Sequence, residues 1–378
     1  MANTFRLILN GTDADEAFYT ELSLLEVEEN ADLPGAIQLS LPVDRSDDGE
    51  VTYVSDDRLQ PFASIAVVVT PDGGNAECIF DGLVLTHKLH LERGTTASTL
   101  KVWGQDFTWQ MNLEEKVKEW VDVTDSDVAN AIFEDYGIAA AADNADDDSP
   151  SHTEDGFTLM QRASDIQFLR TLARRNGKLC RISCAGTPGK RTGIFSRPNL
   201  KADSVLTLDL NDPNGWAVDS LDFEWDVTRP TSVDARQALF TDSDEDGVGA
   251  STSDSGLTLL DARSLAAFAG TSTTVLLTAP VNDARELTLR AQSVLREAGW
   301  FARCEGEADV ARLKAILRAG TVVAVAGAGS LNSGKYFVWS VRHTMTADSH
   351  KMKFTLVRNA VGPPPSSGGA VPGVVGGL

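Results

Sequence analysis

The chain has 378 residues, of which 42% are hydrophobic and 23% charged, and its formal net charge is -22. This length suggests two or three domains with more than one hydrophobic core. So acidic a surface repels DNA and anionic membranes unless a local basic patch overrides it. The same charge fits a well-solvated surface, a salt-adapted source, or the acidic lining of a channel through which polyanions pass.

No secretory signal or membrane span is expected. The N-terminal MANTFRLILNG has too short an apolar run for a signal peptide. No stretch reaches the roughly 18 to 20 apolar residues that a membrane-spanning helix needs. The cysteines are few and lack the two-residue spacing of metal or redox motifs, which favours assembly in a reducing cytoplasm. They are Cys78, Cys180, Cys184 and Cys304.

Residues 1–110 are predicted to form a first β-barrel. Phe5–Gly11 alternates apolar with polar residues and stops at a glycine, as a half-buried strand does. Similar segments follow, separated by turn clusters such as DRSDDGE and TPDGGN. Many short strands at close spacing indicate a barrel or a sandwich.

Residues 111–199 are predicted to form an α/β middle region. Thr124–Ile138 has apolar residues at helical spacing, with Ser126 or Asp125 as the expected cap and Gly137 at the end. The acidic run DNADDDSPSHTEDG that follows indicates an exposed loop.

The segment QRASDIQFLRTLARRNGKLCRI (Gln161–Ile182) comes next and is unusually basic for this chain. An amphipathic helix is predicted from Asp165 to Asn176, with Ser164 and Gln167 as a capping box and Gly177 in the left-handed position after it. A strand follows. Three uses of the cations stay open: nucleic-acid binding, contact with a partner, or pairing with the chain's own acidic surface.

Residues 200–360 are predicted to form a second β-barrel with inserted helices. Helices are expected in LTLLDARSLAAFAG and in NDARELTLRAQSVLREAG, the second with a capping box of Asp283 and Glu286. A hairpin is expected at the end, with one apolar face shared by Phe337, Trp339, Val341, Met352, Phe354 and Leu356. Residues 361–378 form a Pro/Gly-rich tail that is expected to be flexible or bound to a partner.

No catalytic, cofactor-binding or metal-binding residue is predicted. The segment TDSDEDG, with Asp242, Asp244 and Asp246, matches the start of an EF-hand loop, but the twelfth position is Ser253 where calcium needs a bidentate glutamate. His87 and His90 lie three apart on a predicted strand and so point to opposite faces. His152 lies in the acidic loop, and a nearby carboxylate is left open for His343 and His350, which lie in or beside the last hairpin.

Three segments in this order resemble the tail and baseplate hub proteins of contractile injection machines. The family includes the phage late control D proteins and the N-terminal hub region of valine-glycine repeat spike proteins. The first segment is the predicted helix that ends at Tyr136 and Gly137. The helix segment fits at Gln161, Ser164, Asp165, Phe168, Leu169, Leu172, Ala173, Asn176 and Gly177. The closing segment fits at Gly320, Val323, Gly334, Tyr336, Val338, Val341, His343, Arg358 and Asn359.

This resemblance implies a fold and a function. It implies a mainly β protein with an α+β insertion, in which two β-barrel domains of tail-hub type are separated by an α/β region. It implies a homotrimer whose six barrels join a six-fold tail tube to a three-fold spike, with other baseplate proteins nearby. DNA or cargo would pass through the lumen without specific binding. Because no spike repeats follow in this sequence, the spike is expected to be a separate chain.

A structural, non-enzymatic hub is therefore the favoured hypothesis. It would be assembled in a bacterial or archaeal cytoplasm and become part of a phage tail or an injection particle. Two alternatives from other classes stay open. One is a tail-associated cell-wall hydrolase, since 55 acidic residues give many accidental carboxylate pairs. The other is a calcium-stabilised, β-rich adhesin.

Overall fold

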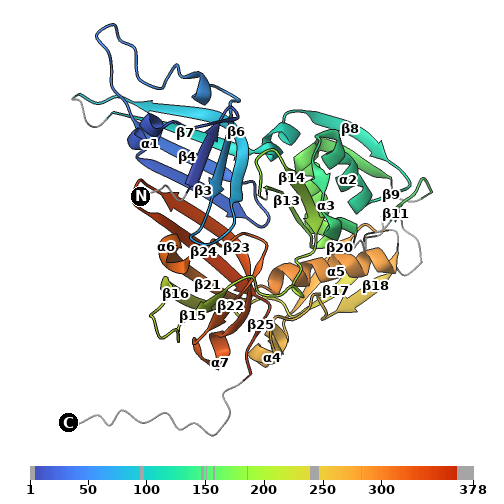
Figure 1. The fold of residues 1–378 in the computed structure, drawn as a ribbon. Helices are drawn as coiled ribbons and strands as arrows, with labels where there is room; N and C mark the ends of the chain where they lie inside the picture. The colour runs from blue at the N-terminus through green and yellow to red at the C-terminus, as the bar shows by residue number, and fades with distance from the viewer. Residues whose placement is uncertain are drawn as a thin grey trace, which may run out of the picture.

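The computed structural model describes residues 5–93, 98–145, 149, 151–155, 158–184, 186–238, 247–281 and 283–363. In this part of the chain the protein is mainly β, with helices gathered in the middle and later parts (Figure 1). The predicted fold class, a mainly β protein with an α+β insertion, is thereby confirmed.

One thirteen-stranded sheet joins the first and last parts of the chain. The central step is the antiparallel pairing of β3 with β23, which places blue and red strands side by side in Figure 1. In order across the sheet the strands are β16 (Val218–Trp225), β21 (Ala302–Asp309), β24 (His350–Arg358), β23 (Gly334–Met345), β3 (Leu24–Asn30), β4 (Ala36–Pro42), β7 (Thr99–Asp106), β6 (Glu77–His90), β5 (Ser64–Val69), β1 (Phe5–Leu9) and β2 (Thr12–Asp13). The two remaining strands are β15 (Thr207–Asp209) and β22 (Val322–Ala326), which pair with each other beside β23.

The largest hydrophobic cluster among the described residues is built on this sheet. Strand β1 shows how the sequence builds it: Phe5, Leu7 and Leu9 are buried while Arg6, which alternates with them, is exposed. The core draws on residues 5–102 and on residues 208–356 alike. The division into two barrels at 1–110 and 200–360 stays a prediction, and in this structure the two regions share a sheet and a core.

The middle region packs helices α2 (Asp125–Asp135) and α3 (Asp165–Asn176) against a small sheet. Helix α3 has the predicted bounds, and Gly177 adopts the left-handed conformation (φ +60°) that ends it. Gly193 on the sheet lets α2 approach closely, because an added Cβ would lie 2.4 Å from the Phe133 ring. The strands of this region are β8 (Glu115–Trp120), β9 (Val123–Thr124), β10 (Ala139–Ala140), β11 (Ser151–His152), β12 (Leu159–Ser164), β13 (Leu179–Cys184) and β14 (Arg191–Ser196).

The predicted caps of these two helices are wrong. Ser164 makes no side-chain cap to α3, because its hydroxyl donates to Asn112 Oδ1 at 2.6 Å. Gln167 donates to the same oxygen at 3.0 Å. Helix α2 is capped by Thr124, in a capping box with Asp127, and not by Asp125 or Ser126. A capping pattern in sequence shows that the side chains could bond each other, but a long-range acceptor such as Asn112 competes for them.

Helix α5 (Ala284–Ala298) covers a three-stranded sheet of β18 (Gly249–Thr252), β17 (Ser232–Gln237) and β20 (Thr274–Ala279). Asp283 caps α5 by accepting from the Glu286 amide at 2.8 Å, whereas the Glu286 carboxylate binds Arg290 at 2.9 Å. The segment LTLLDARSLAAFAG, predicted as a helix, is helical only over α4 (Leu265–Ala269). The capping and breaking signals of a segment define helix ends less well than tertiary contacts do.

The closing hairpin of β23 and β24 is confirmed, but its predicted shared face is wrong. The register shifts by one residue between Val338 and Ser340. A β-bulge of this kind moves the side chains before and after it to opposite faces. Phe337 and Trp339 therefore pack in a cluster with Val357, on the side away from the main core. The core face carries Val338, Val341, Met345, Met352, Phe354 and Leu356.

The remaining elements connect the larger ones. They are α1 (Glu16–Glu21), α6 (Val310–Leu313), α7 (Gly329–Asn332), β19 (Arg263–Ser264) and β25 (Ala360–Val361), with short 3-10 helices at Asp57–Leu59, Phe107–Asn112 and Ala142–Ala145. Among the described residues, none of these helices has the length and apolar character to cross a bilayer. The predicted tail beyond Pro363 lies outside the described residues.

Candidate functional site

The basic segment Gln161–Ile182 directs several of its cations to groups of this same chain. The Arg170 guanidinium donates to the carbonyl of Asp32, and Arg181 donates to the carbonyl of Ala319 at 2.9 Å. Arg175 binds the carboxylate of Asp125. Of the three predicted uses, pairing with the chain's own groups therefore accounts for these cations. They tie the middle region to itself and to the large sheet.

Arg318 lies where three regions meet. Its guanidinium binds Glu29 of β3 at 2.7 Å and Glu77 of β6 at 3.0 Å. It also donates to the carbonyls of Cys78 on β6 and Cys184 on β13, at 2.9 and 3.0 Å. Burial alone would lower the pKa of Arg318, but the charge and hydrogen bonds of Glu29 outweigh burial and raise it. This guanidinium therefore stays charged and fixes the sheet strands relative to the middle region.

A buried cluster around Asp125 holds the acidic loop against the helices. Asp125 accepts from His152 Nε2 at 2.8 Å, from Arg175 and from the Asn176 side chain. Burial would raise the pKa of Asp125, but these hydrogen bonds and the Arg175 charge outweigh burial and lower it. The loop was expected to be exposed, yet His152 is only 4% exposed. The sequence missed this pairing because nothing local links residues 125 and 152.

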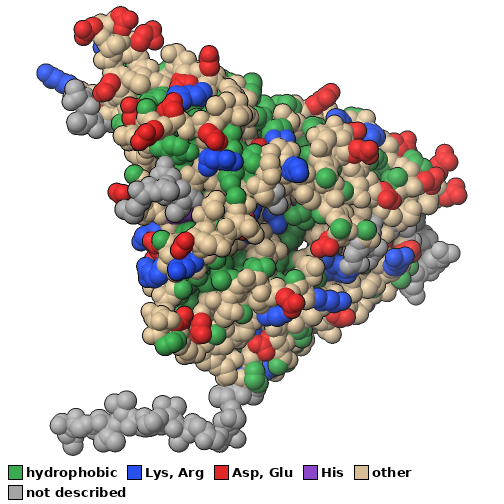
Figure 2. Space-filling view, in the orientation of Figure 1, with side chains coloured by type: hydrophobic (Ala, Val, Ile, Leu, Met, Phe, Trp, Pro, Cys, Tyr) green, Lys and Arg blue, Asp and Glu red, His purple; other side chains and the backbone are tan. Residues whose placement is uncertain are grey.

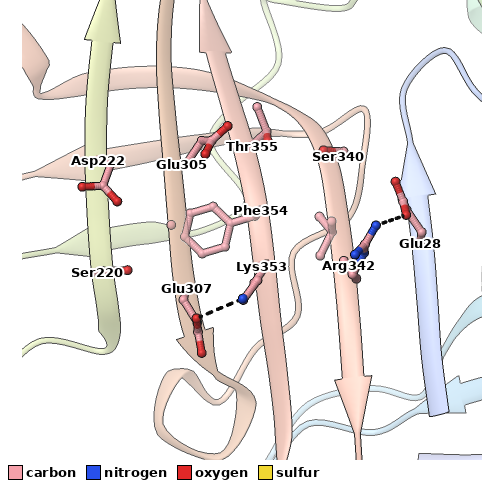
Figure 3. Close-up of a pocket in the computed structure, with 12 residues that line it drawn as sticks. Glu28, Ser220, Asp222, Glu305, Glu307, Ser340, Arg342, Lys353, Phe354 and Thr355 are labelled. Carbon is pink, nitrogen blue, oxygen red and sulfur yellow. Dashed lines mark hydrogen bonds and ion pairs between the residues drawn. The ribbon is translucent and has the colours of Figure 1, made fainter. Parts of the chain in front are cut away.

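An open polar hollow lies on the face of the large sheet formed by β3, β16, β21, β23 and β24 (Figure 3). Its volume is about 490 Å³. The period of two along each strand brings side chains from alternate positions of neighbouring strands to this face. Its polar lining residues are Glu28, Ser220, Asp222, Glu305, Glu307, Ser340, Arg342, Lys353 and Thr355.

Charges of both signs line this sheet face. Arg342 binds Glu28 across the β3–β23 junction at 2.8 Å, and Lys353 lies 3.8 Å from Glu307, as the dashed lines in Figure 3 show. Figure 2 shows both acidic and basic side chains on the face of the molecule that it draws. Exposed ion pairs of this kind add little stability. They are suited to orienting a polar partner surface by complementary charge.

The predicted histidine and metal arrangements have different outcomes. His87 bonds the carbonyl of Leu59 at 2.6 Å and His90 lies 3.6 Å from Glu92, so they do not share a site. His343 and His350 contact each other in the core, and no carboxylate of the described residues bonds either ring. In the described residues no three His, Cys, Asp or Glu side chains converge as metal ligands. The acidic segment with Asp242, Asp244 and Asp246 lies outside the described residues, so calcium binding there stays a prediction.

Several solved structures with this fold are tail or secretion proteins. A 43 kDa tail protein of prophage MuSo2 from Shewanella oneidensis aligns over 95% of this chain and 100% of its own, with 14% identity and a TM-score of 0.66. A tail protein from Neisseria meningitidis MC58 aligns over 95% and 97%, with 13% identity and a TM-score of 0.65. The Escherichia coli c3393 protein, a type VI secretion component, aligns over 91% and 76%, with 12% identity and a TM-score of 0.53.

At these identities the likeness shows the fold, and at that level the predicted resemblance to tail and baseplate hub proteins is confirmed. The protein is thus a β-rich chain with the fold of these tail proteins. It belongs to the family described as the Alg8 N-terminal domain, whose model matches residues 2–347. No curated protein matches the sequence.

Proposed function

We propose that the protein is the structural baseplate hub of a contractile tail or injection system. Three copies would form an adaptor between a six-fold tail tube and a three-fold spike. The observation that carries this proposal is the fold, which the 43 kDa prophage tail protein shares over its whole length. Regions 1–110 and 200–360 are proposed as the two barrel-like units that a trimer presents six times to the tube.

The charge of the chain supports the same role. A net charge of -22 gives a ring of three copies a strongly negative surface. Such a surface repels nucleic acid and acidic proteins, so DNA or cargo would pass through a lumen without adhering to it. Assembly is proposed to take place in the cytoplasm of the producing cell, before the hub is built into a particle.

The role is proposed to be non-catalytic. The Asp125–His152 pair resembles an acid–base dyad in composition, but both side chains are buried and Arg175 and Asn176 occupy the same carboxylate. The pair therefore serves packing, since a general base must reach a substrate proton. Zymography on peptidoglycan tests this: clearing that is lost in a single carboxylate variant would contradict it.

Assembly is the direct test of the hub. The purified chain alone, and with a tail tube protein from the same source, is examined by mass photometry and electron microscopy. We expect a species of about three times 40.5 kDa, and averaged images with a three-fold centre and a six-fold rim on the tube side. A chain that stays monomeric at high micromolar concentration with tube and spike proteins present would exclude the hub.

A second measurement separates the hub from a calcium-stabilised adhesin. The thermal melting temperature is compared with excess calcium and with excess chelator. We expect the two curves to coincide. A large downward shift with chelator would favour the adhesin, because ligands that bind only the folded state stabilise it.

A further inference from the structure

Two adjoining cavities lie beside Trp300 and Trp339, between the middle region, α5 and the large sheet. Their volumes are about 460 and 340 Å³. Both are lined by Glu297, Trp300 and Trp339, so they form one continuous depression. We call it the tryptophan groove. Its further lining residues include Arg174, Leu179, Pro198, Leu257, Phe301 and Val357.

The two tryptophans of this groove are held from beneath. Trp300 stacks on Phe337, with ring centroids 5.6 Å apart and an angle of 21° between the planes. Trp339 lies 6.2 Å from Trp300 and edge-on to Phe337 at 6.4 Å. Phe337 is 1% exposed, whereas both indoles are only partly buried. The groove thus offers a rigid aromatic surface that loses little conformational entropy when it is covered.

The charges around the groove leave its floor apolar. Arg296 donates to the carbonyls of Ser255 and Asn176, and Lys178 donates to Ser126, so these cations are engaged inside the fold. Charged side chains of both signs line the rest of the groove; they are Asp32, Arg174, Glu224, Asp226, Arg229, Glu297 and Arg303. An occupant would therefore be chosen by apolar and ring contacts more than by net charge.

The sequence after the last described residue has the matching chemistry. Residues 364–378 are PPSSGGAVPGVVGGL, with three prolines and no acidic or basic side chain. Pro363 precedes them directly. Proline-rich segments favour the polyproline II conformation, and this conformation binds grooves lined by aromatic rings. The three prolines reduce the entropy that the segment loses on binding, whereas its five glycines increase that loss.

The described chain ends beside the groove. Val361 is 2% exposed and packs in one cluster with Phe301, which lines the groove. The carbonyl of Gly362 accepts from Arg263 Nε at 2.7 Å, which fixes the exit of the chain. Fifteen further residues in a polyproline II conformation would extend roughly 45 Å. Since the chain leaves the fold near Phe301, that length is enough for the segment to lie along the groove of the same copy.

We propose that the tryptophan groove is the binding site for residues 364–378 of this chain. The inference does not depend on the hub, since binding within one copy needs no assembly. In a trimer the same segment would join one copy to the next. Either arrangement covers Trp300 and Trp339 and links the end of the large sheet to α5.

Peptide binding to a shortened chain is the first test. A chain that stops after Pro363 is titrated by calorimetry with a synthetic peptide of residues 364–378. We expect the peptide to bind the shortened chain saturably. It should bind the full chain at least ten-fold more weakly, and it should also bind a shortened chain with Trp339→Leu at least ten-fold more weakly. The control is Trp216→Leu, since Trp216 is 53% exposed and does not line the groove. The shortened chain with Trp216→Leu should bind the peptide with the same affinity as the shortened chain itself.

Each variant is first shown to be folded by its thermal melt, so loss of binding is not mistaken for unfolding. A folded shortened chain that does not bind the peptide overturns the proposal, and so does binding that Trp339→Leu leaves unchanged. A photoreactive residue at Val374 of the full chain then locates the segment. Cross-links to groove residues, within one copy or between copies, support the proposal. Cross-links only elsewhere, or only to tube or spike proteins, overturn it.

Discussion

His343 Nδ1 lies 3.0 Å from His350 Nε2 inside the core of the large sheet. The two rings come from the paired strands β23 and β24, and they are 0% and 5% exposed. The outward nitrogens, His343 Nε2 and His350 Nδ1, have no hydrogen-bond partner among the described residues. Two neutral imidazoles share one hydrogen bond here, and a proton on either ring would be a buried charge.

The first prediction is that this pair makes the protein acid-sensitive. Burial lowers the pKa of both histidines to about 3. At His343 the charge of Arg318 lowers the pKa further. At His350 the neighbouring His343 lowers it further, and Asp309 acts weakly in the opposite direction. The ordinary pKa of 6.5 applies to the unfolded chain. Between about pH 6.5 and 3 the unfolded state therefore binds more protons, and stability falls as pH falls. The slope contributed by the pair reaches about 2.7 kcal/mol per pH unit.

Denaturant unfolding at pH 7.5, 6, 5 and 4 measures this slope. In the double variant His343→Leu with His350→Leu, unfolding should take up one to two fewer protons over that pH window. The slope of the unfolding free energy against pH should be smaller by the corresponding amount. Buried Asp106, whose pKa burial raises to about 6, contributes with the opposite sign in both proteins and cancels in the difference. The control His90→Gln changes an exposed ring and should keep the natural slope. Equal slopes in the double variant and the natural chain would refute the prediction.

Sequence periodicity predicted the parts of the fold that depend on nearest neighbours along the chain. Helix α3 begins and ends where its apolar spacing and Gly177 place it. The hairpin of β23 and β24 was likewise visible as two alternating segments. The bulge between Val338 and Ser340 was not visible in the sequence, because a single inserted residue leaves the alternation on either side intact. The faces assigned to Phe337 and Trp339 were wrong for that reason.

The polar contacts that position the middle region could not be predicted from spacing. Arg318 and Glu29 are 289 residues apart, and His152 and Asp125 are 27 apart. In a chain with 55 acidic residues, many carboxylates could pair with either cation. Only the packing of strands and helices decides which pair forms. The resemblance in sequence supplied the class of fold, but it did not contain these contacts.

Removing Arg318 should destabilise the protein strongly. In Arg318→Met the carboxylate of Glu29, whose side chain is 11% exposed, loses its partner and becomes a buried unpaired charge. Such a loss costs about 3–5 kcal/mol. The matched control is Arg312→Met, because Arg312 also binds an acid but is 52% exposed, and it should cost less than about 1 kcal/mol. Chemical denaturation monitors both, and similar costs for the two variants would show that the junction does not hold the fold.

Removing the Asp125 carboxylate should loosen the acidic loop. Asp125→Ala leaves His152, Arg175 and the Asn176 amide without their common acceptor in a buried site, at a cost of about 3 kcal/mol or more. The control is Asp135→Asn. Asp135 lies exposed at the end of α2, where an acid is unfavourable to the helix dipole. Its substitution should change the free energy of unfolding by no more than about 0.5 kcal/mol.

Hydrogen exchange adds a local readout to the Asp125 variant. Amides of β11 (Ser151–His152) should exchange faster in Asp125→Ala, and those of the large sheet should be affected less. Uniform acceleration over the whole chain would instead indicate that the cluster stabilises the global fold. Unchanged exchange in β11 would contradict the assignment of Asp125 as the residue that anchors the loop.

Gly306 should be replaceable only together with its neighbour Phe354. The two residues face each other across β21 and β24, and a Cβ added at Gly306 would lie 2.5 Å from the Phe354 ring and 2.7 Å from Leu221. Gly306→Ala should therefore cost about 1–3 kcal/mol by overpacking. Adding Phe354→Leu should cost less than the two separate changes summed, since the smaller side chain makes room. The control Gly249→Ala meets only a carbonyl at 3.9 Å and should be close to neutral. A double variant whose cost equals the sum would mean that the ring does not oppose the new methyl group.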